Sequence, residues 1–405
     1  MWTLKQAIEI SKRIKRCTYV CSLDASKDFD KVNRTILWKQ LIQNKISPYV
    51  ILSLINYYND SFLLVNNNYS YSMSFKSTTG VKQGGKCSPK LFSIYLEPLL
   101  DIISQTETGI LIDKIKIDII AYADDILLVS STKSSLQKCL DLVTKFGDFE
   151  IQFNPIKTHY IVFDFSKNKS TMKDNLCLKL SGLNIERVDS TKYLGMQLNE
   201  KYDDRINIKK RIKCSYVALA KLRNLEILTE KTDAYLKGHL YKVYIIPILT
   251  YGLETCSMNK TRINELERVE NKIIRSIYSL PKGCRLSSLR LINNIDRLTN
   301  RLKISQIEFF QRLLKNEFTA NIIRNLLSAG GEGDYMTKIL EILDQIDYPI
   351  EEDVKSKCKY YTFFMNTEHN ANKKNNNELM ELQNIFKLRN GDKQLIFELL
   401  RYDKN

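Results

Sequence analysis

Residues 115–130 read IKIDIIAYADDILLVS, and this stretch decides the fold. Two strongly apolar runs meet at Ala123, Asp124 and Asp125, which predicts two strands joined by a tight turn. Adjacent acids on a protein surface are usually solvated, but apolar residues flank this pair on both sides. Two like charges beside apolar walls are costly unless a cation offsets them, and a divalent metal with oxygen ligands would do so.

A third carboxylate lies at the end of another apolar stretch. Residues 18–24 read TYVCSLD, which predicts a strand that ends at Asp24. If this strand neighbours the turn that carries Asp124 and Asp125, the three acids would form a cage for two metal ions. Such a cage is suited to in-line displacement at phosphorus.

A glycine-rich loop separates the two acidic segments. Residues 80–89 read GVKQGGKCSP, and the Ser88–Pro89 pair predicts a helix start. We expect Ser88 to be the N-cap and Pro89 to take the first helical position. The glycines let the backbone of the loop approach a ligand closely.

The spacing of apolar residues predicts a mixed α/β region followed by a helical region. The first sixteen residues predict an exposed basic helix, and residues 160–163 predict a strand after a turn at Asn154 and Pro155. Strand signals fade beyond about residue 200. The NANKKNNN run at 370–377 predicts a loop or linker. Helices are predicted over residues 35–43, 48–58, 89–103, 134–149, 204–224, 232–250, 262–279 and 296–316.

The composition favours a folded chain with a polyanionic partner. The 405 residues include 62 Lys and Arg against 46 Asp and Glu, which gives a net charge of +16 and suits nucleic acid. On charge alone, a merely basic soluble protein is the alternative. Nine scattered cysteines without a CxxC pair predict reduced thiols in an intracellular protein. The longest apolar stretch, Val243–Leu253, contains Pro247 and is too short to span a bilayer.

Five short motifs resemble those of reverse transcriptases and follow the order of that family. They are DASKDFD (24–30), GVKQG (80–84) with Ser88-Pro89, YADD (122–125), NPIKT (154–158) and YLG (193–195). The form of the second and fifth motifs, together with YGLET at 251–255, is similar to the non-LTR (LINE-type) retrotransposon branch. The resemblance covers the first half of the chain well, the helical part loosely, and nothing after about residue 320.

The resemblance implies an α+β fold of the right-hand polymerase type. A palm, in which helices pack on an antiparallel sheet, would be followed by an all-helical thumb and a helical C-terminal extension. Residues 1–200 would form the palm with partial fingers, residues 201–320 the thumb-like region, and residues 321–405 an extension of unknown role.

The resemblance implies that the activity is RNA-directed DNA synthesis. The reaction would be nucleotidyl transfer to a primer 3′-hydroxyl with two Mg²⁺ ions, for which Mn²⁺ would substitute. Asp24 and Asp124 would ligate both ions, with Asp125 adjacent and less directly involved.

Three further residues would contact the incoming nucleotide if the resemblance holds. Phe29 would act as an aromatic gate against a 2′-hydroxyl, and Gln83 would contact the template–nucleotide pair. Lys157 would lie near the triphosphate as a charge neutraliser or proton donor. The sequence leaves open that Phe29 is an ordinary core residue and that Lys157 is simply solvated.

Primer and template would contact two later segments. Tyr193, Leu194 and Gly195 would form the primer grip, although a Tyr-Leu pair before Gly is also an ordinary turn. A basic run in the helix predicted over 204–224 suits a duplex backbone, or is only a solvated face. Its candidate residues are Lys209, Lys210, Arg211 and Lys213.

The chain departs from the family pattern at several positions. Asp28 stands where a small residue is usual, Gly85-Lys86-Cys87 replaces Cys, Pro and a Leu-like residue, and Cys256 stands where Trp is common. Only 23 residues precede Asp24, so we expect an N-terminally truncated copy with an incomplete fingers region. The alternative function is therefore a catalytically inactive relic that binds RNA or RNA–DNA duplex.

The expected partners follow from the same resemblance. They are an RNA template, a DNA primer or target and dNTPs, with an endonuclease supplied by another chain and no membrane. The resemblance alone, without a localisation signal, places the protein in the nucleus.

Overall fold

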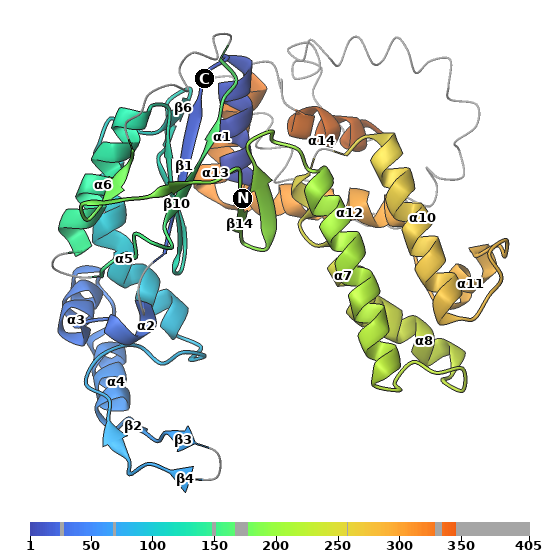
Figure 1. Cartoon of the computed structure of the whole chain (residues 1–405), viewed down its shortest axis with the longest axis horizontal. Helices are drawn as coiled ribbons and strands as arrows, with labels where there is room; N and C mark the ends of the chain where they lie inside the picture. Colours follow the sequence, from blue (N-terminus) through green and yellow to red (C-terminus); the bar gives the residue numbers. More distant parts are fainter. Residues whose placement is uncertain are drawn as a thin grey trace. The chain divides into compact units, whose positions relative to one another are not determined.

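The computed structural model describes residues 1–24, 28–67, 70–147, 151–166, 177–256, 258–328 and 334–345 (Figure 1). The chain forms two compact units. The α/β unit contains Leu4–Leu194 and Leu198–Lys201. The helical unit contains Met1–Thr3, Gly195–Gln197 and the chain from Tyr202 onward. The mixture of helices and sheet confirms the predicted α+β class.

A five-stranded sheet lies at the centre of the α/β unit. Its strand order is β13 (Glu186–Arg187), β10 (His159–Phe163), β1 (Thr18–Leu23), β9 (Asp125–Ser130) and β8 (Ile119–Tyr122). The four longer strands pair antiparallel, whereas β13 runs parallel to β10. The strand predicted from TYVCSLD (18–24) and the strand that follows the turn in residues 115–130 are confirmed. The strand predicted before that turn is divided at Asp118 into β7 (Ile115–Ile117) and β8, and only β8 belongs to the central sheet.

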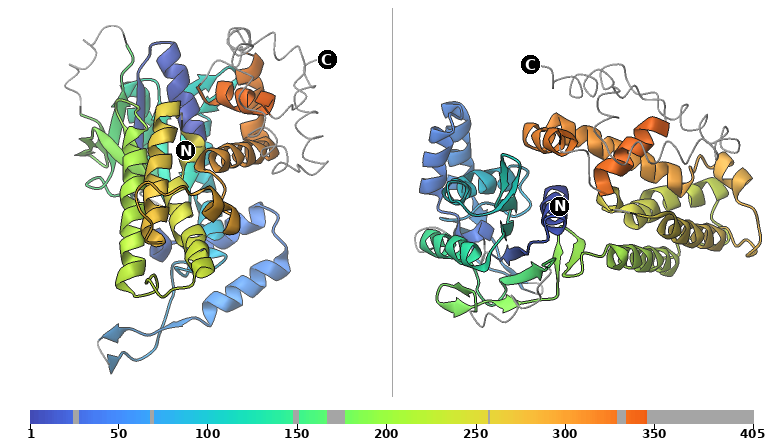
Figure 2. Two further views of the ribbon diagram at one scale, coloured as in Figure 1. Left: turned by 90° about the vertical axis from the view of Figure 1, so that its right-hand side faces the viewer. Right: turned by 90° about the horizontal axis from the view of Figure 1, so that it is seen from above.

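Helices α5 (Ser88–Ser104) and α6 (Lys133–Gly147) pack on one face of this sheet (Figures 1 and 2). Their apolar residues recur at three- and four-residue spacing, so each helix has a continuous apolar stripe. In α6 the fully buried members of the stripe are Leu136, Cys139, Leu140 and Val143. Helices α3 (Arg34–Gln43) and α4 (Pro48–Asn59) add residues to the same hydrophobic core.

The first helix, α1 (Trp2–Arg13), is not the exposed helix that its basic residues predict. Leu4, Ala7 and Ile8 are fully buried, and only the end of the helix, from Lys12, is exposed. Figures 1 and 2 show α1 on the opposite side of the sheet from α5 and α6. The prediction of exposure is wrong because the number of charges obscured an apolar stripe at helical spacing.

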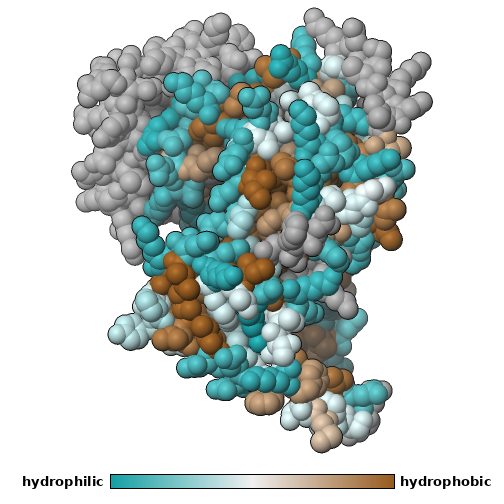
Figure 3. Space-filling model, turned by 90° about the vertical axis from the view of Figure 1, so that its left-hand side faces the viewer, coloured by the Kyte–Doolittle hydropathy of each residue, from teal (hydrophilic) through white to brown (hydrophobic). Residues whose placement is uncertain are grey.

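A hairpin with exposed apolar side chains projects from α4 (Figure 1). It consists of β2 (Phe62–Leu63) paired with β5 (Phe75–Lys76), and of β3 (Asn66–Asn67) paired with β4 (Ser70–Tyr71). Its exposed apolar residues include Phe62, Leu64, Tyr71 and Met73. The lowest part of Figure 3 shows apolar side chains on this projection. Three other short strand pairs are β6–β7 (Ile110–Ile112, Ile115–Ile117), β11–β12 (Lys179–Leu180, Leu183–Asn184) and β14–β15 (Ser190–Tyr193, Met196–Asn199).

The glycine-rich loop lies directly against the short helix α2 (Asp28–Lys31). The backbone N–H of Gly80 donates to the carbonyl of Val32 at 2.8 Å, and that of Val81 donates to the carbonyl of Phe29 at 2.7 Å. Gly80 has a φ of +81°, a conformation that glycine adopts without strain.

Ser88 is the first residue of α5 and not its N-cap, which is Cys87. The Ser88 hydroxyl donates to the carbonyl of Lys82 at 2.6 Å. The prediction is wrong by one residue because the hydroxyl closes the glycine-rich loop instead of capping the helix. Pro89 accordingly occupies the second helical position, where its missing N–H costs nothing.

The helical unit contains the helices that follow the last hairpin. Figure 2 shows α7 and α10 side by side. Its elements are α7 (Arg205–Asn224), α8 (Ala234–Leu240), η2 (Tyr241–Ile245), α9 (Ile246–Thr250), η3 (Leu253–Thr255), α10 (Lys260–Ile277), α11 (Ser287–Ile292), α12 (Leu298–Lys315), α13 (Glu317–Ser328) and α14 (Asp334–Gln345). The loop predicted at 370–377 lies outside the described residues.

The helix predicted over residues 232–250 is interrupted. A π-helical turn, η2, separates α8 from α9. Pro247 lies just after this turn and cannot donate to the carbonyl of Val243, so the regular bonding of an α-helix fails there.

The described residues contain neither a membrane-spanning helix nor a disulfide. No helix in the described part of the chain is long and apolar enough to cross a bilayer. None of the eight cysteines among the described residues forms a disulfide, while Cys358 lies outside them.

The close approach of the glycine-rich loop to α2 generates a stability prediction. A Cβ on Gly80 would lie 2.7 Å from the carbonyl oxygens of both Phe29 and Asp30, whereas a Cβ on Gly84 (φ +79°) would meet nothing within 4 Å. We expect Gly80→Ala to lower the free energy of unfolding by about 3 kcal/mol and Gly84→Ala by about 1 kcal/mol. Urea denaturation measures both, and equal losses would contradict the packing described here.

Candidate active site

Strand pairing places Asp24 beside the acidic hairpin. Strand β1 pairs with β9 with Leu23 opposite Ile126. The next residue on β1 is Asp24, which therefore lies next to Asp125 at the start of β9. The turn that carries Asp124 is at the same edge of the sheet. The structure thus brings together the three predicted acids, which come from distant parts of the chain.

A strained two-residue turn presents Asp124. Tyr122 and Asp125 form the last pair of the β8–β9 hairpin, so Ala123 and Asp124 make the turn. Ala123 has a φ of +52°, which costs a residue with a side chain about 1 kcal/mol or more. Strain of this kind is concentrated at functional sites. Asp124 is exposed at the tip.

The NPIKT segment (154–158) holds the backbone of Asp24 in place. The N–H of Asn154 donates to the Asp24 carbonyl at 2.7 Å, and the N–H of Asp24 donates to the Thr158 hydroxyl at 3.3 Å. Thr158 is fully buried, and its own N–H donates to the Asn154 carbonyl at 2.9 Å. Sequence reasoning singled out only Lys157 in this motif and missed Asn154 and Thr158, which are the residues that position Asp24.

Lys157 lies close to the first acid. Its Nζ is 3.7 Å from Oδ2 of Asp24, and the two side chains are 68% and 42% exposed. A pair this exposed contributes little to stability, so the lysine is available for another anion. Its role near a triphosphate remains a prediction.

The negative charges affect one another. Partial desolvation raises the pKa of the Asp125 carboxyl above its ordinary value, and the charges of Asp124 and Asp24 raise it further. Lys192 acts in the opposite direction. Sequence reasoning also missed Lys192, whose only local signal is its position immediately before the YLG motif.

Tyr193 packs against the acidic hairpin and bonds to its backbone. Its side chain is buried, and its hydroxyl donates to the backbone carbonyl of Asp125 at 3.5 Å. Burial strongly raises the pKa of this phenol, and the charge of Asp125 adds to the effect. Leu194 and Gly195 follow with positive φ values of +45° and +75°, which form a turn. The ring predicted to grip a primer therefore packs beneath the acidic hairpin.

Phe29 and Gln83 occupy different environments. The Phe29 ring stacks on Phe92, with ring centroids 4.9 Å apart, and is partly buried against the hydrophobic core. Gln83 is exposed in the glycine-rich loop. Phe29 therefore packs against the hydrophobic core. A gating role would use the part of its ring that stays exposed.

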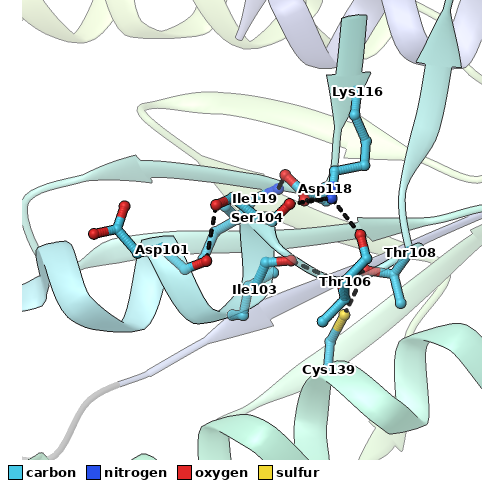
Figure 4. A network of polar contacts seen from close by, with 9 residues as sticks. All are labelled: Asp101, Ile103, Ser104, Thr106, Thr108, Lys116, Asp118, Ile119 and Cys139. Atoms are coloured by element: carbon cyan, nitrogen blue, oxygen red, sulfur yellow. Dashed lines mark hydrogen bonds and ion pairs between the residues drawn. The ribbon is translucent and has the colours of Figure 1, made fainter.

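A buried polar network anchors the strand that enters the hairpin (Figure 4). Asp118, the residue before β8, is buried and forms an ion pair with Lys116 at 2.9 Å. Its carboxylate also accepts from the N–H of Ile119 at 2.8 Å. Lys116 donates to the carbonyls of Ser104 and Thr106 at the end of α5. The hairpin is therefore held at its base by charge-assisted bonds.

The four basic residues predicted on α7 do not share one environment. Lys209 and Lys213 are exposed and Lys210 is half-buried. Arg211 is only 9% exposed, donates to the Gly195 carbonyl at 2.5 Å and covers the Tyr251 ring at 4.5 Å. Arg211 thus stabilises the turn of the YLG motif, and its predicted contact with a duplex backbone is not supported, because its guanidinium is buried.

The three acids have the oxygen ligands that a hard divalent cation prefers, but their carboxylates do not converge on a single point. Among the residues that the structure describes, no three His, Cys, Asp or Glu side chains converge as metal ligands. Asp24, Asp124 and Asp125 nevertheless offer carboxylate oxygens at one edge, and desolvation together with repulsion from Asp124 and Asp24 raises the pKa of Asp125. A divalent cation would relieve this repulsion.

The raised pKa of Asp125 generates a prediction on stability and pH. The pKa of the Asp125 carboxyl in the folded protein lies above its ordinary value of 3.8. The free energy of unfolding therefore falls as the pH rises from 3.8 through the pKa of the folded state. We expect Asp125→Asn to raise Tm at about pH 7 in EDTA, and this gain to vanish at about pH 3. Scanning calorimetry measures both, with the exposed turn variant Asp113→Asn as control. A lower Tm for Asp125→Asn at neutral pH would contradict the electrostatic description.

About half of the chain matches a known protein family. Residues 2–198 match the family described as "Reverse transcriptase (RNA-dependent DNA polymerase)". A Pol polyprotein of the R2 retrotransposable element of Popillia japonica is 24% identical over 66% of this chain and 44% of its own length. The polymerase of the Drosophila melanogaster mobile element jockey is 23% identical over 72% of this chain and 32% of its own length. The chain therefore spans less than half the length of these relatives.

Similarity to solved structures is weaker. Telomerase of Candida albicans in complex with a fragment of telomeric RNA aligns over 84% of this chain and 54% of its own, at 12% identity and a TM-score of 0.41. By the family match and these relatives, residues 2–198 are a reverse transcriptase domain of the kind found in non-LTR retrotransposons.

Proposed function

We propose that the chain is an RNA-directed DNA polymerase that transfers nucleotides to a primer 3′-hydroxyl. The observation that carries the proposal is the pairing of β1 with β9, which sets Asp24 next to the Asp124–Asp125 hairpin. Three acids at one sheet edge, beside a cationic Lys157, suit phosphoryl transfer better than a solvated surface role.

In this proposal each residue has one task. Asp24 and Asp124 hold two Mg²⁺ ions, or Mn²⁺ in their place, with Asp125 adjacent. When bound, the ions would activate the primer hydroxyl and neutralise the leaving pyrophosphate. Lys157 neutralises or protonates the triphosphate, and Thr158 fixes the backbone of Asp24.

The substrate contacts belong to the same proposal. Gln83 contacts the template–nucleotide pair from the glycine-rich loop, and Phe29 closes the site against a 2′-hydroxyl. The α/β unit up to about residue 200 is the palm, with α3, α4 and the projecting hairpin as fingers. Exposed Lys209 and Lys213 on α7 belong to a thumb that contacts phosphates of an RNA–DNA duplex.

The remaining expectations concern partners and place. An RNA template, a DNA primer or target and dNTPs are the proposed substrates, and a separate chain would supply the endonuclease. Synthesis at chromosomal DNA would take place in the nucleus, which imaging of a tagged chain tests.

A second function, binding of RNA or RNA–DNA duplex without synthesis, is favoured by the exposed lysines of α7. Binding through these lysines needs only a basic surface and not the acids. The two functions therefore differ in whether Asp24 and Asp124 matter.

Primer extension distinguishes them. We expect the chain to extend a DNA primer on an RNA template in Mg²⁺, and Asp24→Asn and Asp124→Asn each to reduce the rate roughly a thousandfold, because a lost metal ligand removes several kcal/mol of transition-state stabilisation. Asp113→Asn, in the exposed β6–β7 turn, is the matched control and should retain full activity.

The outcomes are separable. Steep salt-dependent binding of the duplex without extension in Mg²⁺ or Mn²⁺ would favour the binding function alone. Equal extension by Asp124→Asn and Asp113→Asn would exclude the proposed role of the acids.

A further inference from the structure

A polar cleft opens in the helical unit among α10, α11 and α12. Its volume is about 740 Å³, and all of its lining residues lie between positions 267 and 300. A cleft of this size is in the range of ligand-binding sites, which is about 300–1,000 Å³. Neither the five motifs nor the polymerase proposal gives this cleft a role.

The lining is suited to an anion with hydrogen-bonding groups. Arg275, Arg290 and Arg297 provide three guanidinium groups, against the carboxylates of Glu267 and Asp296. The Glu267 carboxylate already accepts a bond from the Thr299 hydroxyl. Neutral donors and acceptors complete the lining: Asn271, Asn294, Asn300, Ser287 and Ser288.

A buried network under the cleft fixes one of the arginines. Glu270 is fully buried and accepts from Arg290 at 2.7 Å, from the Tyr241 hydroxyl at 2.6 Å and from Arg301. Two guanidinium groups, those of Arg290 and Arg301, therefore share the carboxylate of Glu270. Nε of Arg290 is buried and has no hydrogen-bond partner among the described residues. Arg290 is therefore fixed in the wall of the cleft, and its guanidinium also donates to the Asn271 side chain at 2.9 Å.

The cleft also has apolar lining residues. Leu291, in α11, is 84% exposed, and Leu286 and Ile295 are buried in the lining. Inorganic phosphate would gain nothing from these side chains, whereas the face of a nucleobase would. Guanidinium, amide and aliphatic groups together therefore match a nucleotide chain better than a simple anion.

We propose that this cleft binds a single-stranded segment of nucleic acid. Arg275 and Arg297 contact phosphates, while the asparagines and Leu291 contact bases, which a strand exposes and a duplex conceals. The choice of nucleic acid over other polyanions rests on the proposed function. The site is additional to the acidic hairpin and to the lysines of α7.

Fluorescence anisotropy of the full chain with a labelled ten-nucleotide single strand tests the proposal. We expect Arg275→Ala/Arg297→Ala to weaken binding about tenfold at moderate salt and to lower the salt slope by about 1.4, since each phosphate contact to a single strand contributes about 0.7. Lys260→Ala/Arg268→Ala, also on the helical unit with the same change in charge, is the control, because both residues are exposed and neither lines the cleft.

A second variant separates loss of ligand contacts from loss of loop structure. Arg275 donates to the Cys284 carbonyl at 3.1 Å, so its loss could loosen the loop, and Arg297→Glu at an exposed position provides a second variant. RNA and DNA strands of one sequence are compared, and tighter binding of RNA would assign a 2′-hydroxyl contact to the cleft. Photocrosslinking should place the strand at residues 286–297.

Several results would overturn the proposal. These are equal losses in the cleft and control variants, crosslinks confined to other segments, or release of the strand by millimolar inorganic phosphate at constant ionic strength. Asp113→Asn should bind the strand as the unaltered chain does. Failure of primer extension by the unaltered chain, with retained cleft binding, would reject the polymerase and leave the cleft proposal standing.

Discussion

The antiparallel pairing of β1 with β9 is the constraint on which the candidate site depends. With Leu23 opposite Ile126, the end of one strand lies beside the start of the other, and Asp24 neighbours Asp125. A slip of one residue would turn the side chains of β1 to the opposite faces of the sheet and separate the acids. The buried apolar residues of both strands prevent such a slip, so the hydrophobic core determines where the charges lie.

The site is held in a conformation that is costly by itself. Ala123 is strained, and desolvation and the neighbouring charges of Asp124 and Asp24 raise the pKa of Asp125. Three groups of contacts hold the acids in this conformation. The Tyr193 hydroxyl donates to the Asp125 carbonyl, Thr158 accepts from the N–H of Asp24, and Lys116 pairs with Asp118 at the start of β8. Strain and repulsion of this kind persist only where the surrounding structure enforces them, which is typical of functional sites.

Much of this arrangement could be predicted from the sequence because its signals are local. The apolarity of residues 18–24 and 115–130 predicts β1 and the two strands of the acidic hairpin, and the acids end or join these strands. What the sequence could not indicate depends on long-range packing. Arg211 reads like its lysine neighbours until Tyr251 and Gly195 surround it. The hydroxyl of Thr158 matters only because the fold brings it to Asp24.

The central claim is that the three acids form one binding site for divalent cations. Electron paramagnetic resonance of Mn²⁺, with primer, template and nucleotide present, tests it most directly by counting bound ions. The account predicts about two ions per chain, fewer in Asp24→Asn and in Asp124→Asn, and an unchanged number in Asp113→Asn. Unchanged Mn²⁺ binding in both Asp24→Asn and Asp124→Asn would contradict it.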